Sequence, residues 1–340
     1  MFADDSAIVR GFMRRWVEDD HRIELIKACS DGLQVVAEAA AHHPDVVILD
    51  IDMPGMDGLA TLPHLRKVAP HARIVMASTH TPDGSVAAMK ALGGGACDII
   101  AKPEASAIGS VEAFRRELIE TIVALGKPRS SSPRPAIKLR PAPPTCCPGS
   151  LLVVATATGG PAALQSFLAP IARRIDAPIL IVQHMPAPFT ALLAEKLEQA
   201  TGRHCREARD DDTLASGAML VAPGDHHLRV ARCPAGRMVH LDKSDPLHFR
   251  RPAADVLFES AAAAFGPRVV GVVLTGAGGD GCEGSAKIAA AGGRVIVQDE
   301  ASSLVWGMPG AVALAGHAEA VRPLKDLSTL ALRMMNGEAA

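Results

Sequence analysis

The sequence lacks an excess of charge of either sign, a long apolar run and an apolar leader. Its 35 Lys and Arg residues stand against 37 Asp and Glu residues, a net charge of −2, which argues against broad electrostatic attraction to nucleic acid or anionic lipid. No apolar run approaches the roughly 20 residues that span a bilayer. The first residues, MFADDSAIVR, lack the apolar core of a signal peptide. We therefore expect a cytoplasmic protein without nucleic-acid or membrane partners.

The cysteines lack the paired spacing of a metal site, and no ligand spacing recurs among the histidines. An odd number of cysteines in a cytoplasmic chain favours free thiols. A vicinal pair, Cys146 and Cys147, is a candidate redox pair, but it lies in linker-like sequence with no helix N-terminus to favour a thiolate. The seven cysteines are Cys29, Cys97, Cys146, Cys147, Cys205, Cys233 and Cys282.

What the sequence does contain is two blocks in which strand-like runs alternate with helical patterns. This alternation predicts an α/β protein with two doubly wound parallel-sheet domains, each covered by helices on both faces. Residues 127–150 separate the blocks and read KPRSSSPRPAIKLRPAPPTCCPGS, a composition typical of an extended, solvated tether. The predicted domains are residues 1–126 and 151–335.

The first block has a strand stub before Asp4. A central strand needs about five residues, so a stub this short would leave Asp4 and Asp5 poorly anchored unless the true start lies upstream. The other predicted strands are Ile23–Ala28, Asp45–Leu49, Arg73–Ala77 and Asp98–Ala101.

Polar residues end these strands, and the carboxyl ends of parallel strands gather at one edge of a sheet. Three carboxylates brought together repel one another unless a hard cation such as Mg²⁺ lies among them. With a lysine and a hydroxyl nearby, such a carboxylate can accept a phosphoryl group. The converging residues are Asp4, Asp5, Asp50, Ser78 and Lys102, whereas Asp31, Asp52 and Asp57 are interpreted as surface or helix-capping residues.

This constellation resembles the receiver domain of two-component response regulators. The resemblance implies that Asp50 is the phosphoacceptor and that a histidine kinase is its phosphoryl donor. It also implies that Asp4 and Asp5 hold Mg²⁺ together with Asp50, that Ser78 is the switch hydroxyl, and that Lys102 senses the phosphate.

The second block opens with LLVVATATGGPAAL (residues 151–164), a buried strand followed by a turn of small residues and a helix that starts near Pro161. Such a turn lies at the ligand-binding edge of an α/β sheet. The runs around Pro234–Gly236, between Leu228 and Leu241, predict a β-hairpin insert. Other predicted elements are strands at Leu151–Ala155, Ile179–Gln183, Met219–Ala222, Val269–Leu274 and Arg294–Gln298, and a helix at Ala253–Phe265.

Two further strand ends carry candidate chemistry. His184 follows the second strand of this block, and Asp280 lies in a glycine-rich turn ahead of a helix. With the turn after residue 155 they would converge as a nucleophile position, a base and an acid that fixes the imidazole tautomer. Backbone N–H groups at Gly159 and Gly160 could stabilise an oxyanion.

This block resembles the catalytic domain of the chemotaxis protein-glutamate methylesterases, whose turn reads Gly-Ala-Ser-Thr-Gly-Gly. Aligned without a gap, that motif places Ala157 at the position of the nucleophilic serine. The resemblance implies demethylation of glutamyl esters on methyl-accepting chemotaxis receptors, deamidation of receptor glutamines, and a receiver that covers the active site until it is phosphorylated. It extends over APGDHHLRV (222–230), RPAADVLFES (251–260) and QDEASSLVWGMPGAV (298–312).

Ala157 leaves open whether the chain is an active esterase, because a methyl group cannot attack an ester. Loss of the nucleophile costs such an enzyme roughly a factor of 10⁶ in turnover. Thr156 and Thr158 are candidate substitutes, although their side chains leave a tight turn in other directions. The alternative is a catalytically inert, phosphorylation-regulated protein that binds receptor segments or competes for the kinase's phosphoryl group.

A third hypothesis is a dinucleotide enzyme. Gly276, Gly278 and Gly281 form a Gly-x-Gly-x-x-Gly pattern after a strand, and Asp299 follows the next strand where a ribose-binding acid belongs. Against it, Asp280 would place a negative charge where a pyrophosphate should lie. His226 and His227 are predicted to be surface residues.

Overall fold

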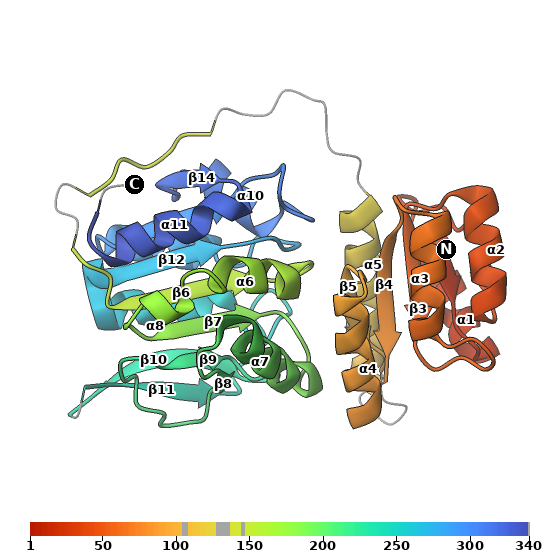
Figure 1. Cartoon of the computed structure of the whole chain (residues 1–340), viewed down its shortest axis with the longest axis horizontal. Helices are drawn as coiled ribbons and strands as arrows, with labels where there is room; N and C mark the ends of the chain where they lie inside the picture. The colour runs from red at the N-terminus through yellow and green to blue at the C-terminus, as the bar shows by residue number, and fades with distance from the viewer. Residues whose placement is uncertain (80, 104–107, 127–136, 144–146, 235, 339–340) are drawn as a thin grey trace. The chain divides into compact units, whose positions relative to one another are not determined.

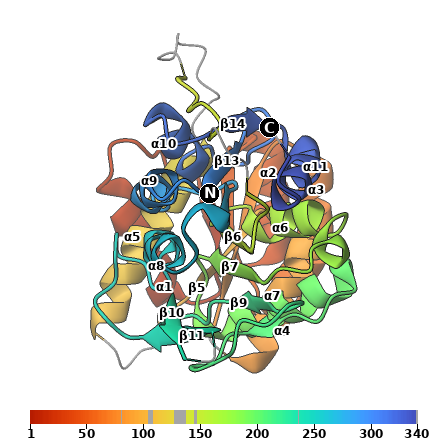
Figure 2. The same cartoon turned by 90° about the vertical axis from the view of Figure 1, so that its left-hand side faces the viewer.

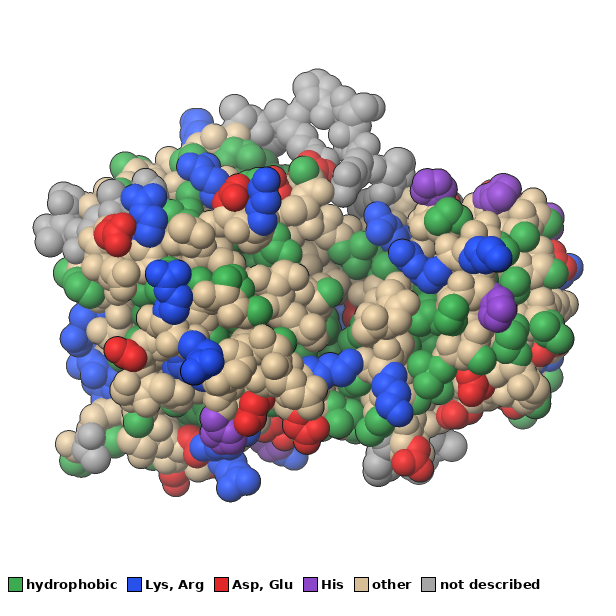
Figure 3. Space-filling model, viewed as in Figure 1, with side chains coloured by type: hydrophobic (Ala, Val, Ile, Leu, Met, Phe, Trp, Pro, Cys, Tyr) green, Lys and Arg blue, Asp and Glu red, His purple; other side chains and the backbone are tan. Residues whose placement is uncertain are grey.

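The structure is a computed structural model that describes residues 1–79, 81–103, 108–126, 137–143, 147–234 and 236–338 (Figure 1). It contains two compact units, Met1–Ser132 and Pro133–Ala340, and each is described by itself. Basic and acidic side chains are interspersed on the face shown in Figure 3. None of the helices in the described segments combines the length and apolar character that a bilayer crossing requires.

The first unit is a five-stranded parallel sheet in the order β2-β1-β3-β4-β5. On its faces α1 packs against α5, and α3 packs against both α2 and α4. β1 pairs with β2 on one side and with β3 on the other, so the strands that follow β2 are added on the opposite side of β1. Ligands bind at such a reversal of strand order, at the carboxyl ends of the strands. The elements are β1 (Phe2–Ala3), α1 (Ala7–Glu18), β2 (Ala28–Cys29), α2 (Gly32–His42), β3 (Val46–Asp50), α3 (Gly58–Val68), β4 (Arg73–Ser78), α4 (Pro82–Gly93), β5 (Asp98–Ala101) and α5 (Ile108–Gly126).

Local sequence explains several of these boundaries. All five residues of β3 are buried, as its unbroken apolar run predicts for a central parallel strand. Two helices begin at an aspartate whose carboxylate accepts a backbone N–H: Asp31 from Gln34 at 2.8 Å and Asp57 from Ala60 at 2.7 Å. The interpretation of these two aspartates as helix caps is confirmed.

The first two strands differ from their predictions. The strand predicted at Ile23–Ala28 is only Ala28–Cys29, because β2 is an edge strand. The expectation that a short first strand leaves Asp4 poorly anchored was wrong. Asp4 is fully buried, and its backbone N–H donates to the Cys29 carbonyl at 3.2 Å.

The second unit is a seven-stranded sheet in the order β14-β13-β12-β6-β7-β9-β8, with every pair parallel. Figure 2 shows α8, α9 and α10 on one side of this sheet and α6, α7 and α11 on the other. Within this unit β6 is the first strand in sequence and the central one in the sheet; the next strands are added on its β7 side and the later ones on its β12 side. The loops after β6 and β12 therefore meet at the position where this topology predicts a site.

The bounds in this unit follow the predictions closely, with β8 and β14 added at the two edges. The predicted hairpin is β10 and β11, which form a separate two-stranded antiparallel sheet. The elements are β6 (Leu151–Thr156), α6 (Gly160–Leu168), a 3₁₀ turn (Ala172–Arg174), β7 (Ile179–Gln183), α7 (Ala187–Thr201), β8 (Arg206–Glu207), β9 (Met219–Val221), β10 (His227–Cys233), β11 (Gly236–Asp242), α8 (Ala254–Phe265), a second 3₁₀ turn (Gly266–Arg268), β12 (Val269–Val273), α9 (Cys282–Ala290), β13 (Arg294–Gln298), α10 (Met308–Leu314), β14 (Ala320–Arg322) and α11 (Leu324–Met335).

Parts of the predicted linker lie against the second unit. Arg140 donates its backbone N–H to the Ala318 carbonyl at 2.8 Å and its guanidinium to the Gly293 carbonyl at 2.9 Å. Gly149 donates to the Met335 carbonyl at 3.0 Å. At these positions the segment is attached rather than a solvated tether. Residues 127–136 and 144–146, which include Cys146, lie outside the described residues.

Candidate functional site

The first unit brings Asp4, Asp50 and Lys102 together at the carboxyl edge of its sheet. Asp50 is the last residue of β3, Asp4 follows β1, and Lys102 follows β5. The Lys102 ammonium lies 2.6 Å from an oxygen of Asp50 and 2.7 Å from an oxygen of Asp4. Both carboxylates are almost fully buried. The lysine thus neutralises part of a buried negative charge.

Burial dominates the electrostatics of Asp50. It raises the pKa of this carboxyl to about 6, although the charge of Lys102 acts in the opposite direction. Ser78 is the last residue of β4 and is fully buried. Its hydroxyl donates to the Thr79 carbonyl at 3.2 Å. The five predicted receiver residues therefore lie at the ends of four neighbouring strands, at one edge of the sheet.

The donor set at this edge fits a hard divalent cation. Carboxylate oxygens of Asp4, Asp5 and Asp50 lie within 4.8 Å of one another, and oxygen ligands at such spacing suit Mg²⁺. Asp5 is exposed and Asp4 and Asp50 are buried, so an ion held there would have both solvent and protein on its sides. Asp52, next to this cluster, is exposed as predicted.

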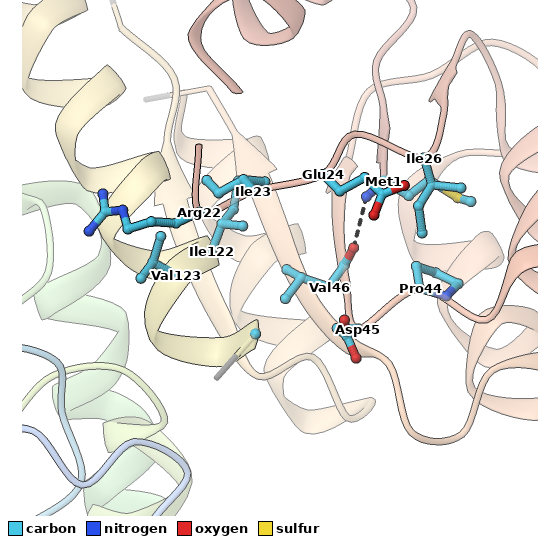
Figure 4. Close-up of a pocket in the computed structure, with 11 residues that line it drawn as sticks. Met1, Arg22, Ile23, Glu24, Ile26, Pro44, Asp45, Val46, Ile122 and Val123 are labelled. Atoms are coloured by element: carbon cyan, nitrogen blue, oxygen red, sulfur yellow. Dashed lines mark hydrogen bonds between the residues drawn. The ribbon is translucent and has the colours of Figure 1, made fainter. Parts of the chain in front are cut away.

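A cavity in this unit lies at the opposite edge of the sheet. It measures about 400 Å³ and is lined mainly by apolar side chains, among them Ile23, Ile26, Val46 and Ile122 (Figure 4). Beside it the amino group of Met1 donates to the Val46 carbonyl at 3.0 Å. Because β1 and β3 begin here and the carboxylates lie where these strands end, the cavity is separate from the carboxylate site.

In the second unit, strand register places Ala157 beside His184. Thr156 pairs with Gln183 in the parallel register of β6 and β7, so Ala157 and His184 are the next residues on each strand. On the other side Ala157 donates its N–H to the Thr275 carbonyl at 3.1 Å, after the end of β12. Gly159, with φ +78°, leads into α6, a left-handed conformation that favours glycine.

His184 and Asp280 form a buried pair. The Nε2 atom of His184 lies 2.7 Å from Oδ2 of Asp280, and both side chains are about 95% or more buried. Since Nε2 faces the carboxylate, Nδ1 is the ring nitrogen that remains for a nucleophile or a bound group. The structure thus joins the predicted base and acid and places the predicted nucleophile position beside the base.

Asp280 is held in its ionised form by its neighbours. Burial opposes ionisation, but the hydrogen bond from His184 and those from the Ala254 and Asp255 amides outweigh it and lower the pKa of Asp280 to about 2. Those amides donate at 2.6 and 2.9 Å, and the Gly281 amide donates at 2.9 Å. A carboxylate with four donors is a rigid orienting group for an imidazole.

Thr156 does not present a free hydroxyl at the site. Thr156 is fully buried and donates its hydroxyl to the Thr275 carbonyl at 2.7 Å. Thr158 is buried, and its carbonyl accepts from the Thr275 hydroxyl at 3.0 Å. Gln183 donates its side-chain amide to the Ala157 carbonyl at 2.9 Å. Sequence reasoning missed both Thr275 and Gln183, which fix the turn.

Gly276, the first glycine of the pattern proposed to bind a dinucleotide, is hydrogen-bonded to the segment that leads into α10. Gly276 donates to the Val305 carbonyl at 3.0 Å and accepts from Gly307 and Met308. Asp299 accepts from the backbone and hydroxyl of Ser302. The acid proposed to bind a ribose therefore caps a turn.

The prediction that His227 is a surface residue was wrong, whereas the prediction of free thiols is confirmed for the cysteines that the structure describes. His227 is fully buried: its Nδ1 accepts from the Ala253 amide and its Nε2 faces the Asp245 carbonyl, each at 3.2 Å. His227 and Leu228, the first two residues of β10, are both fully buried, so alternation along the strand gave no signal that separates His227 from His226. The cysteines in the described segments, Cys29, Cys97, Cys147, Cys205, Cys233 and Cys282, are free thiols.

The first parallel sheet carries a carboxylate–lysine site where its strand order reverses, and the second carries a histidine–aspartate pair at the same kind of position. Together these features define a response regulator with an output domain of hydrolase type. Residues 1–108 match the response regulator receiver domain, and residues 152–330 match the CheB methylesterase family. The chain belongs to the protein-glutamate methylesterase family, a family of hydrolases.

Curated relatives match nearly the whole chain. Protein-glutamate methylesterase/protein-glutamine glutaminase 2 of Caulobacter vibrioides is 45% identical over 337 residues, which cover 96% of each chain. The Azospirillum brasilense protein-glutamate methylesterase/protein-glutamine glutaminase is 41% identical over 96% of this chain and 90% of its own length. The crystal structure of the Thermotoga maritima CheB methylesterase catalytic domain, 34% identical, covers 55% of this chain and 100% of that one with a TM-score of 0.54.

Proposed function

We propose that the chain is a phosphorylation-controlled chemotaxis response regulator directed at the methylated glutamates, and at glutamines, of methyl-accepting chemotaxis receptors. The observation that carries the proposal is the buried His184–Asp280 pair beside the turn at Ala157. It supports the proposal because these side chains are the base and acid of an acyl-transfer site. The names of the curated relatives supply the substrate class.

In the proposed receiver, Asp50 accepts the phosphoryl group from the histidine kinase of a chemotaxis system. Asp4, Asp5 and Asp50 would hold Mg²⁺, which when bound neutralises charge on the phosphoryl group. Lys102, already paired with Asp50 at 2.6 Å, is positioned to bind the phosphorylated side chain, and Ser78 supplies the switch hydroxyl. Phosphorylation of Asp50 then controls the activity of the output domain.

The proposal assigns residues 1–126 to the receiver, residues 127–150 to the connection and residues 151–335 to the output domain. A cytoplasmic location belongs to the same proposal, because the kinase acts there on Asp50.

Ala157 separates two forms of this function. A methylesterase needs a nucleophile at the turn, and the Thr156 hydroxyl is donated to a carbonyl elsewhere. Ala157 therefore favours the second form: the chain recognises receptor segments, or takes phosphoryl groups from the kinase, while ester turnover is lower by roughly 10⁶ than that of a serine-bearing chain.

Methanol release from methylated receptors separates the two forms. With Asp50 phosphorylated, we expect background release from the natural chain and strong release from Ala157→Ser, because serine restores the missing hydroxyl beside His184. The double variant Ala157→Ser/His184→Gln is the matched control and should return to background. Robust release by the natural chain would contradict the inert form, and no release by Ala157→Ser would contradict the proposed site.

A further inference from the structure

A tight turn brings a second histidine to the output domain's acidic site. Leu247 and Arg250 exchange backbone hydrogen bonds of 3.1 and 2.9 Å, which closes a two-residue turn. Its central residues, His248 and Phe249, have φ of +51° and +61°, values that a Cβ atom disfavours. Phe249 is 72% exposed, whereas His248 reaches back toward α8. The strained turn therefore holds His248 against the domain.

Asp255, in the first turn of α8, is the acid that His248 meets. The residue is 95% buried, and its Oδ1 accepts from the Gly284 amide at 2.6 Å. Its Oδ2 has no hydrogen-bond donor among the described residues. The nearest cationic group recorded is Nε2 of His248 at 3.3 Å. One oxygen of a buried carboxylate thus relies on an imidazole that is half exposed.

Asp255 is also joined to the proposed acid of the site. Its backbone N–H donates to Asp280 at 2.9 Å, and polar atoms of His248, Asp255 and Asp280 lie within 4.8 Å of one another. A metal ion would find both Asp280 oxygens already engaged by four donors. The arrangement is instead two histidine–carboxylate pairs side by side, His184 with Asp280 and His248 with Asp255.

We propose that His248 is a positioning residue, whose ring beside Oδ2 keeps Asp255 ionised so that Asp255 does not compete with His184 for Asp280. A neutral Asp255 carries an O–H that can donate to the Asp280 carboxylate. That hydrogen bond would weaken the one that orients His184. This inference rests on the proposed function only for the role of His184 and Asp280 as base and acid.

The electrostatics of Asp255 place this competition near neutral pH. Burial, together with the Asp280 charge, raises the pKa of Asp255 to about 6, and the charge of His248 opposes the rise. The other titratable groups around it are Cys282, whose thiol pKa is raised by burial and by Asp255, the adjacent Glu283, and His227 of β10, which holds the Ala253 amide.

Carboxyl ¹³C titration of the natural full-length chain tests the pairing without requiring turnover. We expect Asp255 to titrate near pH 6, and near pH 7 or higher in His248→Gln, because removing an opposite charge at this range shifts a carboxyl by about one pH unit or more. His248→Lys keeps a cation and should restore the lower midpoint. His240→Gln is the matched control, because His240 makes a similar 3.1 Å contact with an exposed acid, Asp210.

The ring N–H resonance of His184 reports the second half of the inference. At pH 6.5 we expect the hydrogen-bonded signal to persist in the natural chain, in His248→Lys and in His240→Gln, and to be lost in His248→Gln. Asp255→Asn, which places an amide donor toward Asp280, should lose it at every pH. An unchanged Asp255 midpoint or a persistent His184 signal in His248→Gln would overturn the inference. Failure of Ala157→Ser to release methanol would overturn only the proposed function.

Discussion

At the scale of single residues, burial of the Asp50 carboxylate lowers the stability of the folded receiver at neutral pH. The carboxylate's folded-state pKa of about 6 lies above the value near 4 expected in the unfolded chain. Between these values the folded state holds a proton that the unfolded state has released. The contribution of Asp50 to folding free energy therefore falls as pH rises from about 4 to about 6 and stays low above that range.

Asp50→Asn should accordingly stabilise the metal-free receiver at pH 7.5, by about 1–3 kcal/mol, and change its stability little at pH 4. Urea unfolding at the two pH values in the presence of a chelator measures this difference. Asp52→Asn, two residues away and exposed, is the control and should be neutral at both pH values. Equal effects of Asp50→Asn at pH 4 and pH 7.5 would contradict the account.

The same scale separates what the sequence could predict of the site from what it could not. His184 directly follows an apolar run and Asp280 lies in the glycine-rich turn after another, so strand ends located them. The contact between His248 and Asp255 left no such signal, because it depends on a turn with two left-handed residues that are neither glycine nor asparagine. Thr275 was missed because its role lies in hydrogen bonds to backbone carbonyls, for which residue type alone gives no pattern.

At the scale of elements, the turn between β6 and α6 depends on close backbone approach. A Cβ atom at Gly160 would lie 2.0 Å from the Gln183 side-chain oxygen and 2.5 Å from the Thr156 hydroxyl. Both neighbours are buried and hydrogen-bonded, so neither can move without loss of a bond that holds the turn. Gly160 lies within the bounds of α6, so it does not need the left-handed conformation that favours glycine. Glycine is required here because a Cβ atom has no space.

Gly160→Ala should therefore destabilise the second unit by about 1–3 kcal/mol, the usual range for an overpacked interior. Gly279→Ala is the matched control, because its Cβ would meet only the Ala311 methyl at an ordinary 3.6 Å; we expect a change within about 0.5 kcal/mol. Denaturant unfolding followed by circular dichroism compares the two. Equal effects would show that the close approach at Gly160 does not constrain the turn.

Element prediction succeeded where strands are central and failed at edges. The runs Ile179–Gln183 and Arg294–Gln298 have the predicted bounds, because a strand buried on both faces is an unbroken apolar run. The edge strands Arg206–Glu207 and Ala320–Arg322 were missed, since strands of two or three residues are too short to show a periodicity. The strand expected at Ile23–Ala28 is shorter in the structure because it lies at the edge of the sheet, where most of these side chains are partly or fully exposed.

At the scale of the whole molecule, both units use the same topological feature. Each parallel sheet starts from an inner strand and grows in both directions, so polar residues after that strand and its later neighbour meet at one edge. In the first unit this edge collects Asp4 and Asp50, and in the second it collects Ala157 and the acid–histidine pair. The chain thus combines a carboxylate–lysine site in its receiver domain with a histidine–aspartate site next to Ala157 in its second domain.

The most direct test of this central claim uses the Ala157→Ser chain and measures, by mass spectrometry, the rate at which an electrophilic organophosphonate labels the introduced serine. A serine activated by His184 and Asp280 should be labelled far faster than any other serine of the chain. Adding His184→Gln should abolish that labelling, and phosphorylation of Asp50 should accelerate it. Labelling of the introduced serine at the rate of an ordinary serine, or at a rate independent of His184, would contradict the account.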